Sequence, residues 1–415
     1  MAIAEKTSPA PDVDKLRSYF PALKSGFAYL ENAGGAQVPG MVADAIREYM
    51  LSTYVQIGAG YPQSMAAGNN IDKAHAFANT VMGGDGIGQT ILGPSTTALT
   101  HTLAQAYAEV MPAGTRVIAA ETGHEANVGP WARLAKRGFD FQIWRLDPET
   151  LQCPLDALEK LLVEKPTKIV AFPHVSNLLG EIVDVKAITE LAHRYGARVV
   201  VDGVAYAPHR PIDVKAWNVD WYVFSWYKVF APHMAALFGT AEALDEVEGP
   251  NHFFIPKATI PYKFQLGGIT HEGCAGLNAL APYLNVVAGR PESARCDRQT
   301  VVDAFSAMTA LELPLQKRYI DFLKSKPRVR IIGPQHGEAS RVSTISFVHD
   351  RLTPPEIVSK VHEQPIGIRY GNAYAYRLCQ ALGLDTTTGV VRASFVHYNT
   401  IDEVERLCGA LDGLL

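Results

Sequence analysis

Two residues of complementary chemistry, Asp202 and Lys228, each follow a short apolar segment of the sequence. Residues 199–201 (VVV) lead directly into Asp202, and residues 221–224 (WYVF) lie just upstream of Lys228. Apolar runs this short, rich in valine and aromatic residues, are typical of strands that are buried on both faces. Ligands bind beyond the carboxyl ends of the strands in an open parallel sheet. We therefore expect the carboxylate and the amine to meet in one site.

An acid and an amine in one site match the needs of pyridoxal 5′-phosphate (PLP). Its ring nitrogen needs a carboxylate to keep its proton, and its aldehyde forms a Schiff base with a lysine. Taken singly, an aspartate after a strand most often forms a turn or caps a helix, and a loop lysine is usually solvated. Lys228, however, lies in the largely apolar segment SWYKVF (residues 225–230). Burial there would lower the pKa of the lysine and make its amine a usable nucleophile.

Three sequence patterns resemble the class V aminotransferase family, and within it the cysteine desulfurase and selenocysteine lyase branch. They are Asp-Gly at 202–203, Ser-x-x-Lys at 225–228 and Val-Arg-Ala-Ser at 391–394. The resemblance runs from about Tyr29 to the C-terminus and implies an α/β protein of PLP-dependent fold type I. That fold has a large domain, with a mostly parallel seven-stranded sheet between helices, and a smaller C-terminal α+β domain.

The elements that must position these residues follow from the pattern of the chain. Strands and helices alternate from about residue 90 to residue 240, which favours a parallel α/β sheet. We expect residues 1–28 to form an N-terminal leader and arm, residues 29–290 the large PLP-binding domain, and residues 291–415 the small C-terminal domain. Helices are expected at about 274–287 and 292–310.

The resemblance also implies how the cofactor is held. A Ser-Thr-Thr loop at 95–97 precedes a predicted helix, where phosphate binding and simple helix capping both fit the sequence. His124 would stack on the cofactor ring and relay protons, since the imidazole pKa lies near neutrality. Thr270 or His271 would reach the phosphate of a neighbouring subunit in a homodimer with shared active sites. The predicted cofactor-binding residues are Ser95, Thr96, Thr97, His124, Asn177, Asp202, Ser225, Lys228 and Thr270.

Lys228, His124 and Asp202 are the predicted catalytic residues. Lys228 would act as general base and acid, and Asp202 would keep the pyridine nitrogen protonated. Arg392 is expected to clamp the α-carboxylate of an amino-acid substrate, because its planar fork binds two oxygens at once. Asn32 and Tyr374 are the other predicted substrate-binding residues.

Three positions depart from the family pattern. Desulfurases carry a nucleophilic cysteine on a loop where this chain has Tyr374, and a tyrosine cannot take up sulfur as a persulfide. The nearest thiol, Cys379, lies in a predicted helix and is expected to be a buried apolar residue. Ala205 stands where the family often has glutamine, and Tyr227 where it usually has histidine.

These observations favour a PLP-dependent enzyme that is not a persulfide-forming desulfurase. The leading hypothesis is a lyase that cleaves a β-substituent of an amino acid, by C–S cleavage or by β-decarboxylation, with or without coupling to an electrophile. An aminotransferase or an epimerase is the enzymatic alternative. A non-catalytic PLP-binding regulatory protein is an alternative of another class. The combination of Lys228, Asp202, His124 and Arg392 argues against it, because binding alone would not need a carboxylate clamp.

The composition excludes several other classes of protein. The chain has 415 residues, 47% of them hydrophobic, and a net charge of −4, which gives no sign of a nucleic-acid partner. Five cysteines without CxxC or zinc-like spacing argue against a disulfide framework and a metal site, and favour a cytoplasmic location. No segment approaches the roughly 20 apolar residues of a membrane span, and the N-terminus lacks the apolar core of a signal peptide.

Overall fold

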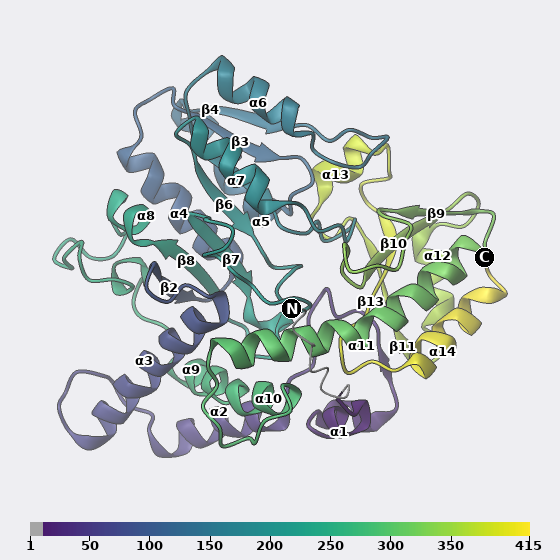
Figure 1. Cartoon of the computed structure of the whole chain (residues 1–415), viewed down its shortest axis with the longest axis horizontal. Helices are drawn as coiled ribbons and strands as arrows, with labels where there is room; N and C mark the ends of the chain where they lie inside the picture. The colour runs from purple at the N-terminus through teal and green to yellow at the C-terminus, as the bar shows by residue number, and fades with distance from the viewer. Residues whose placement is uncertain (1–10) are drawn as a thin grey trace, which may run out of the picture.

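A seven-stranded sheet forms the centre of the computed structural model, which describes residues 11–415 (Figure 1). Its strands, in chain order, are β2 (Gly88–Gly93), β3 (Arg116–Ala120), β4 (Asp140–Trp144), β5 (Thr167–Pro173), β6 (Arg198–Asp202), β7 (Trp221–Ser225) and β8 (Ala235–Thr240). In space they lie in the order β2-β8-β7-β6-β5-β3-β4. Only β8 runs antiparallel to its neighbours, so the predicted mostly parallel sheet is confirmed.

Helices cover both faces of this sheet because successive strand residues point to opposite sides. Val199 and Val201 pack into one apolar cluster with α3, α6, α7, α9 and α10, whereas Val200 packs into another with α4, α5 and α8. All three valines are fully buried, as the apolar run predicts. The helices are α3 (Pro62–Met82), α4 (Thr96–Val110), α5 (Glu125–Arg133), α6 (Leu155–Glu164), α7 (Val185–Arg194), α8 (Ala241–Glu246), α9 (His271–Asn278) and α10 (Leu280–Val287).

A second, antiparallel sheet follows in the C-terminal part of the chain, with strand order β12-β13-β10-β9. Its strands are β9 (Val329–Ile332), β10 (Thr344–His349), β12 (Arg369–Gly371) and β13 (Val390–Ser394). The helices of this part are α12 (Pro354–Val361), α13 (Tyr376–Ala381) and α14 (Ile401–Asp412). Its core is an apolar cluster separate from those of the large sheet.

Two segments connect the large sheet with this C-terminal part. Helix α11 (Arg298–Lys324) crosses the molecule (Figure 1), and its first half packs on the large-sheet core while its second half packs on the C-terminal core. Strand β1 (Ala28–Tyr29) follows α1 (Val13–Ser18), precedes α2 (Gly40–Ser52), and pairs with β11 (Ile366–Gly367). The division at residues 29–290 and 291–415 therefore remains a proposal, and residues 1–10 of the predicted leader lie outside the described residues.

The helix predicted at 292–310 was wrong in its bounds. Helix α11 begins at Arg298, because the Asp297 side chain accepts a hydrogen bond from the Thr300 N–H (2.8 Å) and caps the helix there. It then continues to Lys324 with Pro314 inside it. The helix predicted at 274–287 is instead two helices, α9 and α10, which Ala279 separates.

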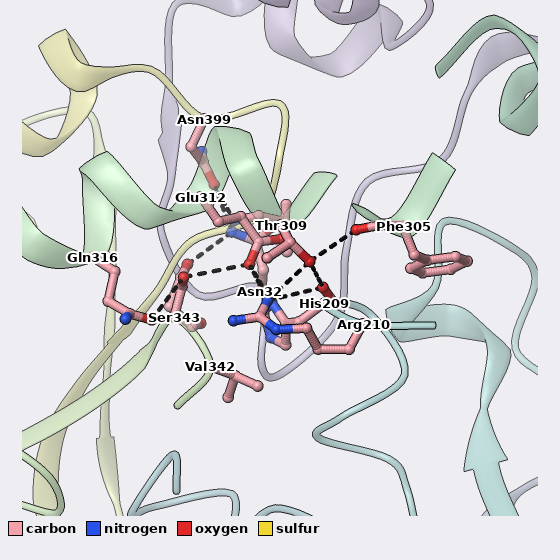
Figure 2. A network of polar contacts seen from close by, with 12 residues as sticks. Asn32, His209, Arg210, Phe305, Thr309, Glu312, Gln316, Val342, Ser343 and Asn399 are labelled. Carbon is pink, nitrogen blue, oxygen red and sulfur yellow. Dashed lines mark hydrogen bonds and ion pairs between the residues drawn. The ribbon is translucent and has the colours of Figure 1, made fainter. Parts of the chain in front are cut away.

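A network of buried polar side chains joins the loop after β6 to α11 (Figure 2). His209 Nδ1 lies 2.8 Å from Glu312 Oε2, and the Ser343 hydroxyl lies 3.3 Å from the same oxygen. Arg210 Nη1 donates to the Thr309 hydroxyl at 3.2 Å. The network thus fixes the chain that follows Asp202 against the helix that links the two sheets.

The described residues also lack two kinds of feature. No helix among them is both long enough and apolar enough for a membrane crossing. Within residues 11–415, no cluster of histidine, cysteine and acidic side chains is arranged to hold a metal ion.

Candidate active site

Asp202 and Lys228 face one small cavity at the carboxyl ends of β6 and β7. The two strands are paired, with Asp202 opposite Val223, and a short 3-10 helix (Trp226–Lys228) follows β7. The exposed fractions of Asp202 and Lys228 are 4% and 8%. The structure therefore brings together the acid and the amine that the sequence places after neighbouring strands. Other predicted residues that line the cavity are Ser95, Thr96, Thr97, His124, Asn177 and Ser225.

The Asp202 carboxylate has spare hydrogen-bonding capacity. Its Oδ1 accepts from the Val204 N–H at 2.9 Å, and within residues 11–415 its side chain has no other donor. Burial raises the pKa of Asp202 to about 6, although the Val204 bond and the charge of Lys228 act in the opposite direction. A protonated ring nitrogen is the kind of donor that this carboxylate lacks.

Lys228 is a buried amine without an ion pair or a hydrogen bond to Nζ among the described residues. Burial, followed by the charge of Arg392, lowers the pKa of Lys228 to about 8, and the nearby Asp202 carboxylate raises it. A substantial fraction of the amine is therefore neutral near physiological pH, as a nucleophile or a proton carrier requires.

The N-terminus of α4 forms the part of the cavity suited to a phosphate. Ser95 caps the helix by accepting from the Ala98 N–H (3.1 Å), and Thr96 Oγ1 lies 2.7 Å from Ser225 Oγ. Helix capping and anion binding are therefore compatible here, because the cap uses one N–H and the first turn has others.

His124 contributes a neutral imidazole to the cavity. Its Nδ1 accepts from the Ala126 N–H at 2.9 Å, which leaves the proton on Nε2. Burial, with the charges of Lys228 and Arg392, lowers the pKa of His124 to about 3. The ring centroid lies 5.3 Å from that of Tyr374.

Arg392 lines a second, outer cavity, which adjoins the smaller one and shares Lys228, His124 and Asn177 with it. The arginine is 3% exposed, donates through Nη1 to Asn177 O (3.1 Å) and pairs through Nη2 with Glu31 (3.3 Å). Its buried Nε has no partner among the described residues, nor does Asn177 Oδ1. Unpaired buried polar atoms are costly unless a ligand supplies the missing bonds. With the free capacity of Asp202, these atoms are compatible with bound PLP, and the role of Arg392 toward an amino-acid carboxylate stays a prediction.

The structure gives two of the predicted residues other surroundings. Asn32 was expected to bind substrate, but it is 2% exposed and its amide donates to Tyr29 O (2.9 Å), Ser394 O (2.8 Å) and Asn399 Oδ1 (3.1 Å). These bonds use both amide hydrogens, so Asn32 is a structural residue. Thr270 caps α9 and lies outside both cavities, so its predicted reach to a second subunit stays a prediction.

The loop that contains Tyr374, at the position where desulfurases carry their nucleophilic cysteine, borders the outer cavity. Tyr374 is 70% exposed, and its carbonyl accepts from the Glu125 N–H at 2.9 Å. Cys379 is fully buried in α13, and burial raises its pKa to about 11. Within residues 11–415, no cysteine lines either cavity.

Sequence reasoning missed four polar residues of this region. Glu31 lies 3.3 Å from both Arg392 and Arg369, so it links the predicted clamp to a second arginine. His101 and Arg133 line the outer cavity from α4 and α5. Helical spacing was the available signal, because His101 lies one turn after Thr97 and Arg133 two turns after Glu125.

Comparisons with known proteins agree with this geometry. The family model "Aminotransferase class-V" matches residues 28–407. The aminotransferase-like protein FGM3 of Gibberella zeae is 35% identical, over 99% of this chain and 100% of that protein. The cysteine desulfurase-like protein ustD of Aspergillus flavus is 30% identical, over 97% and 91%. The apo structure of a cysteine desulfurase from Thermococcus onnurineus superimposes with a TM-score of 0.83 at 25% identity, over 97% of each chain.

Proposed function

The chain belongs to the class V aminotransferase family of PLP-dependent enzymes, and within it we propose that it is a lyase acting on the β-substituent of an amino acid. One observation carries this proposal. The described cofactor site has its lysine, aspartate, histidine and arginine, while no thiol lines it. Without such a thiol, sulfur cannot be taken up as a protein persulfide, so the leaving group goes to solvent.

Each polar group of the site has a distinct task in this proposal. When bound, PLP supplies an electron sink for bonds at the α-carbon of an amino acid. Asp202 holds the proton on the ring nitrogen, and its raised pKa reflects the burial that such a pairing offsets. Arg392 binds the substrate α-carboxylate and so fixes which bond at the α-carbon is activated. Lys228 Nζ, with a pKa of about 8, takes and returns a proton at the α- or β-carbon.

The surroundings of these groups support β-cleavage. The Tyr374 ring lies beside His124 at the mouth, and the loop backbone is fixed by hydrogen bonds from the Glu125 N–H and from the Asn177 amide to Ala373 O (2.7 Å). A loop held in this way suits a small product that leaves directly, with no sulfur to be carried to a partner. The β-substituent is either a sulfur group or a carboxylate, and the remaining carbon is protonated or joined to an electrophile.

The experiment is a product screen of the PLP-loaded enzyme with single L-amino acids. Alanine, pyruvate, sulfide and CO₂ are measured, with and without an added thiol. We expect thiol-independent β-cleavage products. Amino-group transfer to a keto acid, or racemised substrate without cleavage, would replace the lyase by an aminotransferase or an epimerase. Thiol-dependent sulfide release from cysteine that disappears in Cys379→Ala would restore the desulfurase function.

We also propose that the enzyme is a cytoplasmic homodimer. Two exposed segments carry apolar side chains of the kind that an interface buries. All five cysteines are free, which fits a reducing compartment. Size-exclusion chromatography with light scattering tests the dimer. The exposed apolar residues are Met50, Leu51, Tyr54, Ile57, Tyr61 and Met65 in one segment and Phe253, Phe254 and Leu266 in the other.

A further inference from the structure

The outer cavity has a wall that the proposed reaction does not yet use. Helices α4 and α5 each turn one face toward this cavity of about 560 Å³. Thr97 and His101 face it from α4, and Glu125, Gly129 and Arg133 face it from α5. The spacing of four residues on both helices places these side chains in rows that run from the cofactor cavity outward. The outermost residue of the α4 row is His101, which can donate a hydrogen bond, and that of the α5 row is Arg133, which is basic.

Arg133 differs from the other arginines at this mouth. Arg369 and Arg392 both pair with Glu31 at 3.3 Å, and Arg377 pairs with Glu125 at 3.3 Å. Arg133, in contrast, has no carboxylate within ion-pair distance in the part of the chain that the structure describes. A cation without a counter-ion at the mouth of a catalytic cavity attracts an anionic ligand.

His101 and Arg133 act on the same part of the cavity. Partial burial lowers the pKa of His101, and the charge of Arg133 lowers it further, so the two side chains are close enough to interact. The imidazole is therefore neutral at neutral pH and can donate one hydrogen bond. Gly129, one turn before Arg133, has no side chain of its own, and the Glu125 carboxylate takes up the space over it, since a Cβ there would lie 2.8 Å from Glu125 Oε1. The one acidic group on this wall, Glu125, is already paired with Arg377.

We propose that Arg133 and His101 form a second anion subsite, which selects an amino acid whose side chain carries a carboxylate, of the aspartate class. The proposal rests on the proposed lyase function. Arg392 takes the α-carboxylate, and Arg133 takes the side-chain carboxylate as the substrate enters. Arg133 is thus a specificity-determining residue, because a neutral β-substituent gains nothing from it.

The chemistry that follows is balanced without a further reactant. The bond between the β-carbon and the side-chain carboxyl carbon breaks, CO₂ leaves, and the electron pair remains on the β-carbon. A proton from solvent, delivered through Lys228 Nζ, takes up that pair. The sum is aspartate plus one proton to alanine plus CO₂, with no oxidant or reductant.

Binding measured apart from turnover tests the subsite. L-aspartate and L-asparagine are matched in size and differ in the charge of the side chain. Each is titrated into the PLP-loaded enzyme and its Kd is taken from the change in cofactor absorbance, for the wild type and for Arg133→Gln. We expect the wild type to bind aspartate at least about tenfold more tightly than asparagine, which corresponds to about 1.4 kcal/mol. In Arg133→Gln that ratio should fall to about twofold, with asparagine binding unchanged.

Arg137→Gln is the matched control. Arg137 is also exposed, has no carboxylate partner among the described residues, and lines neither cavity. This variant should keep the wild-type ratio, and raised salt should shrink the ratio in the wild type because an exposed charge is screened.

The outcomes separate this inference from the proposed function. An unchanged ratio in Arg133→Gln overturns the subsite, whatever the enzyme cleaves. A change in the oligomeric state of Arg133→Gln, with an unchanged ratio, assigns Arg133 to an interface between copies and overturns the subsite as well. Preferential cleavage of an uncharged β-substituent leaves the lyase standing and removes the subsite. Selective aspartate binding without β-cleavage removes the lyase and keeps the subsite.

Discussion

The cofactor cavity and the buried network of Figure 2 both place ionisable side chains out of water, but they satisfy them differently. In the network, Glu312 Oε2 lies 2.8 Å from His209 and 3.3 Å from Ser343. In the cavity, the Asp202 side chain has a single backbone N–H, and Lys228 Nζ has no partner within residues 11–415. Burial of charge is common to both regions, so burial alone does not identify the active site. A missing partner does not identify it either, since Glu312 Oε1 of the network also lacks one among the described residues. What distinguishes the cavity is that Asp202 and Lys228 both face the same open space.

Two buried lysines show the same contrast. Lys263 is 1% exposed, and its Nζ donates to the carbonyls of Leu244 (2.6 Å) and Val247 (3.0 Å). Burial lowers the pKa of both Lys263 and Lys228, because desolvation disfavours the charged form in either place. The Lys263 ammonium donates its hydrogen bonds to backbone carbonyls, whereas the Lys228 amine has no such partner among the described residues and is available to a ligand.

The largest expected effect separates these two lysines. Lys228→Ala should lose product formation by about 10⁴-fold or more, because the variant lacks the nucleophile and the proton carrier. It should unfold at a temperature close to that of wild-type apoprotein, since Nζ has no hydrogen bond or ion pair to lose within residues 11–415 and only its contact with the Tyr227 ring and the packing of its stem are removed. Product assays and thermal unfolding of the apoproteins measure the two effects.

Lys263→Met is the counterpart, and the reverse pattern is expected of it. Removal of a buried donor leaves two carbonyls unpaired, so the variant should unfold at a lower temperature. Its turnover per folded molecule should stay within about threefold of wild type. Similar loss of turnover in both variants would contradict the distinction between paired and unpaired buried groups.

The next effect concerns the carboxylate of the cavity. Asp202→Asn should lower turnover by about 10³-fold, because an amide cannot hold the proton on the ring nitrogen as a carboxylate does. It should also stabilise the apoprotein, but only above a certain pH. The raised pKa means that the stability contributed by Asp202 is fully present below its unfolded pKa, and is lost as pH rises through about 6.

Thermal unfolding of apoprotein at pH 4 and pH 8 measures this second effect. The variant should equal wild type at pH 4 and exceed it at pH 8, where wild type carries the unpaired charge. A variant that is less stable than wild type at pH 8 would show that the Asp202 carboxylate has structural partners after all.

The third effect concerns Glu312 in the buried network, where substitution should lower stability but change turnover little. Glu312→Ala leaves His209 and Ser343 without their shared acceptor, so the free energy of unfolding should fall by about 3 kcal/mol. Glu312→Gln keeps an acceptor in place and should lose about 1 kcal/mol. Urea unfolding measures both changes. Turnover of the folded fraction should fall less than about tenfold, and a larger fall in Glu312→Gln would assign the network a role in catalysis.

The contrast between the two regions also explains what the sequence reveals. The strands that end at Asp202 and Ser225 are local apolar runs, and the parallel sheet brings their ends together whatever the rest of the chain does. The buried state of Lys228 follows from its immediate neighbours in the same way. The two residues that define the cofactor cavity were therefore predictable.

Partners that lie far apart in the sequence were not predictable. The amide of Asn32 is bonded to Ser394 and Asn399, which are more than 360 residues away, and this turns an expected substrate ligand into a structural residue. Glu31 likewise meets Arg392 across 361 residues. No local pattern signals such bonds, because they depend on the pairing of β1 with β11 and on the bridge between Glu31 and Ser394 of β13.

The smallest expected effect tests how the cavity tunes its amine. The rate at which apoprotein incorporates PLP should rise with pH and level off with a midpoint near 8, since only the neutral Lys228 amine reacts. Arg392→Met should move that midpoint upward, because the positive charge of Arg392 disfavours the protonated lysine. The midpoint should still stay below 10.5, the ordinary pKa of a lysine, because burial is the larger cause and remains in the variant.

Stopped-flow absorbance across a pH series measures these midpoints, and Arg137→Met should keep the wild-type one. A downward shift in Arg392→Met would mean that the loss of the guanidinium deepens the desolvation of Lys228 more than it relieves repulsion. The midpoint thus compares two causes within one cavity, desolvation and neighbouring charge. The buried network does not allow this comparison of desolvation with neighbouring charge, because Glu312 already contacts both His209 and Arg210.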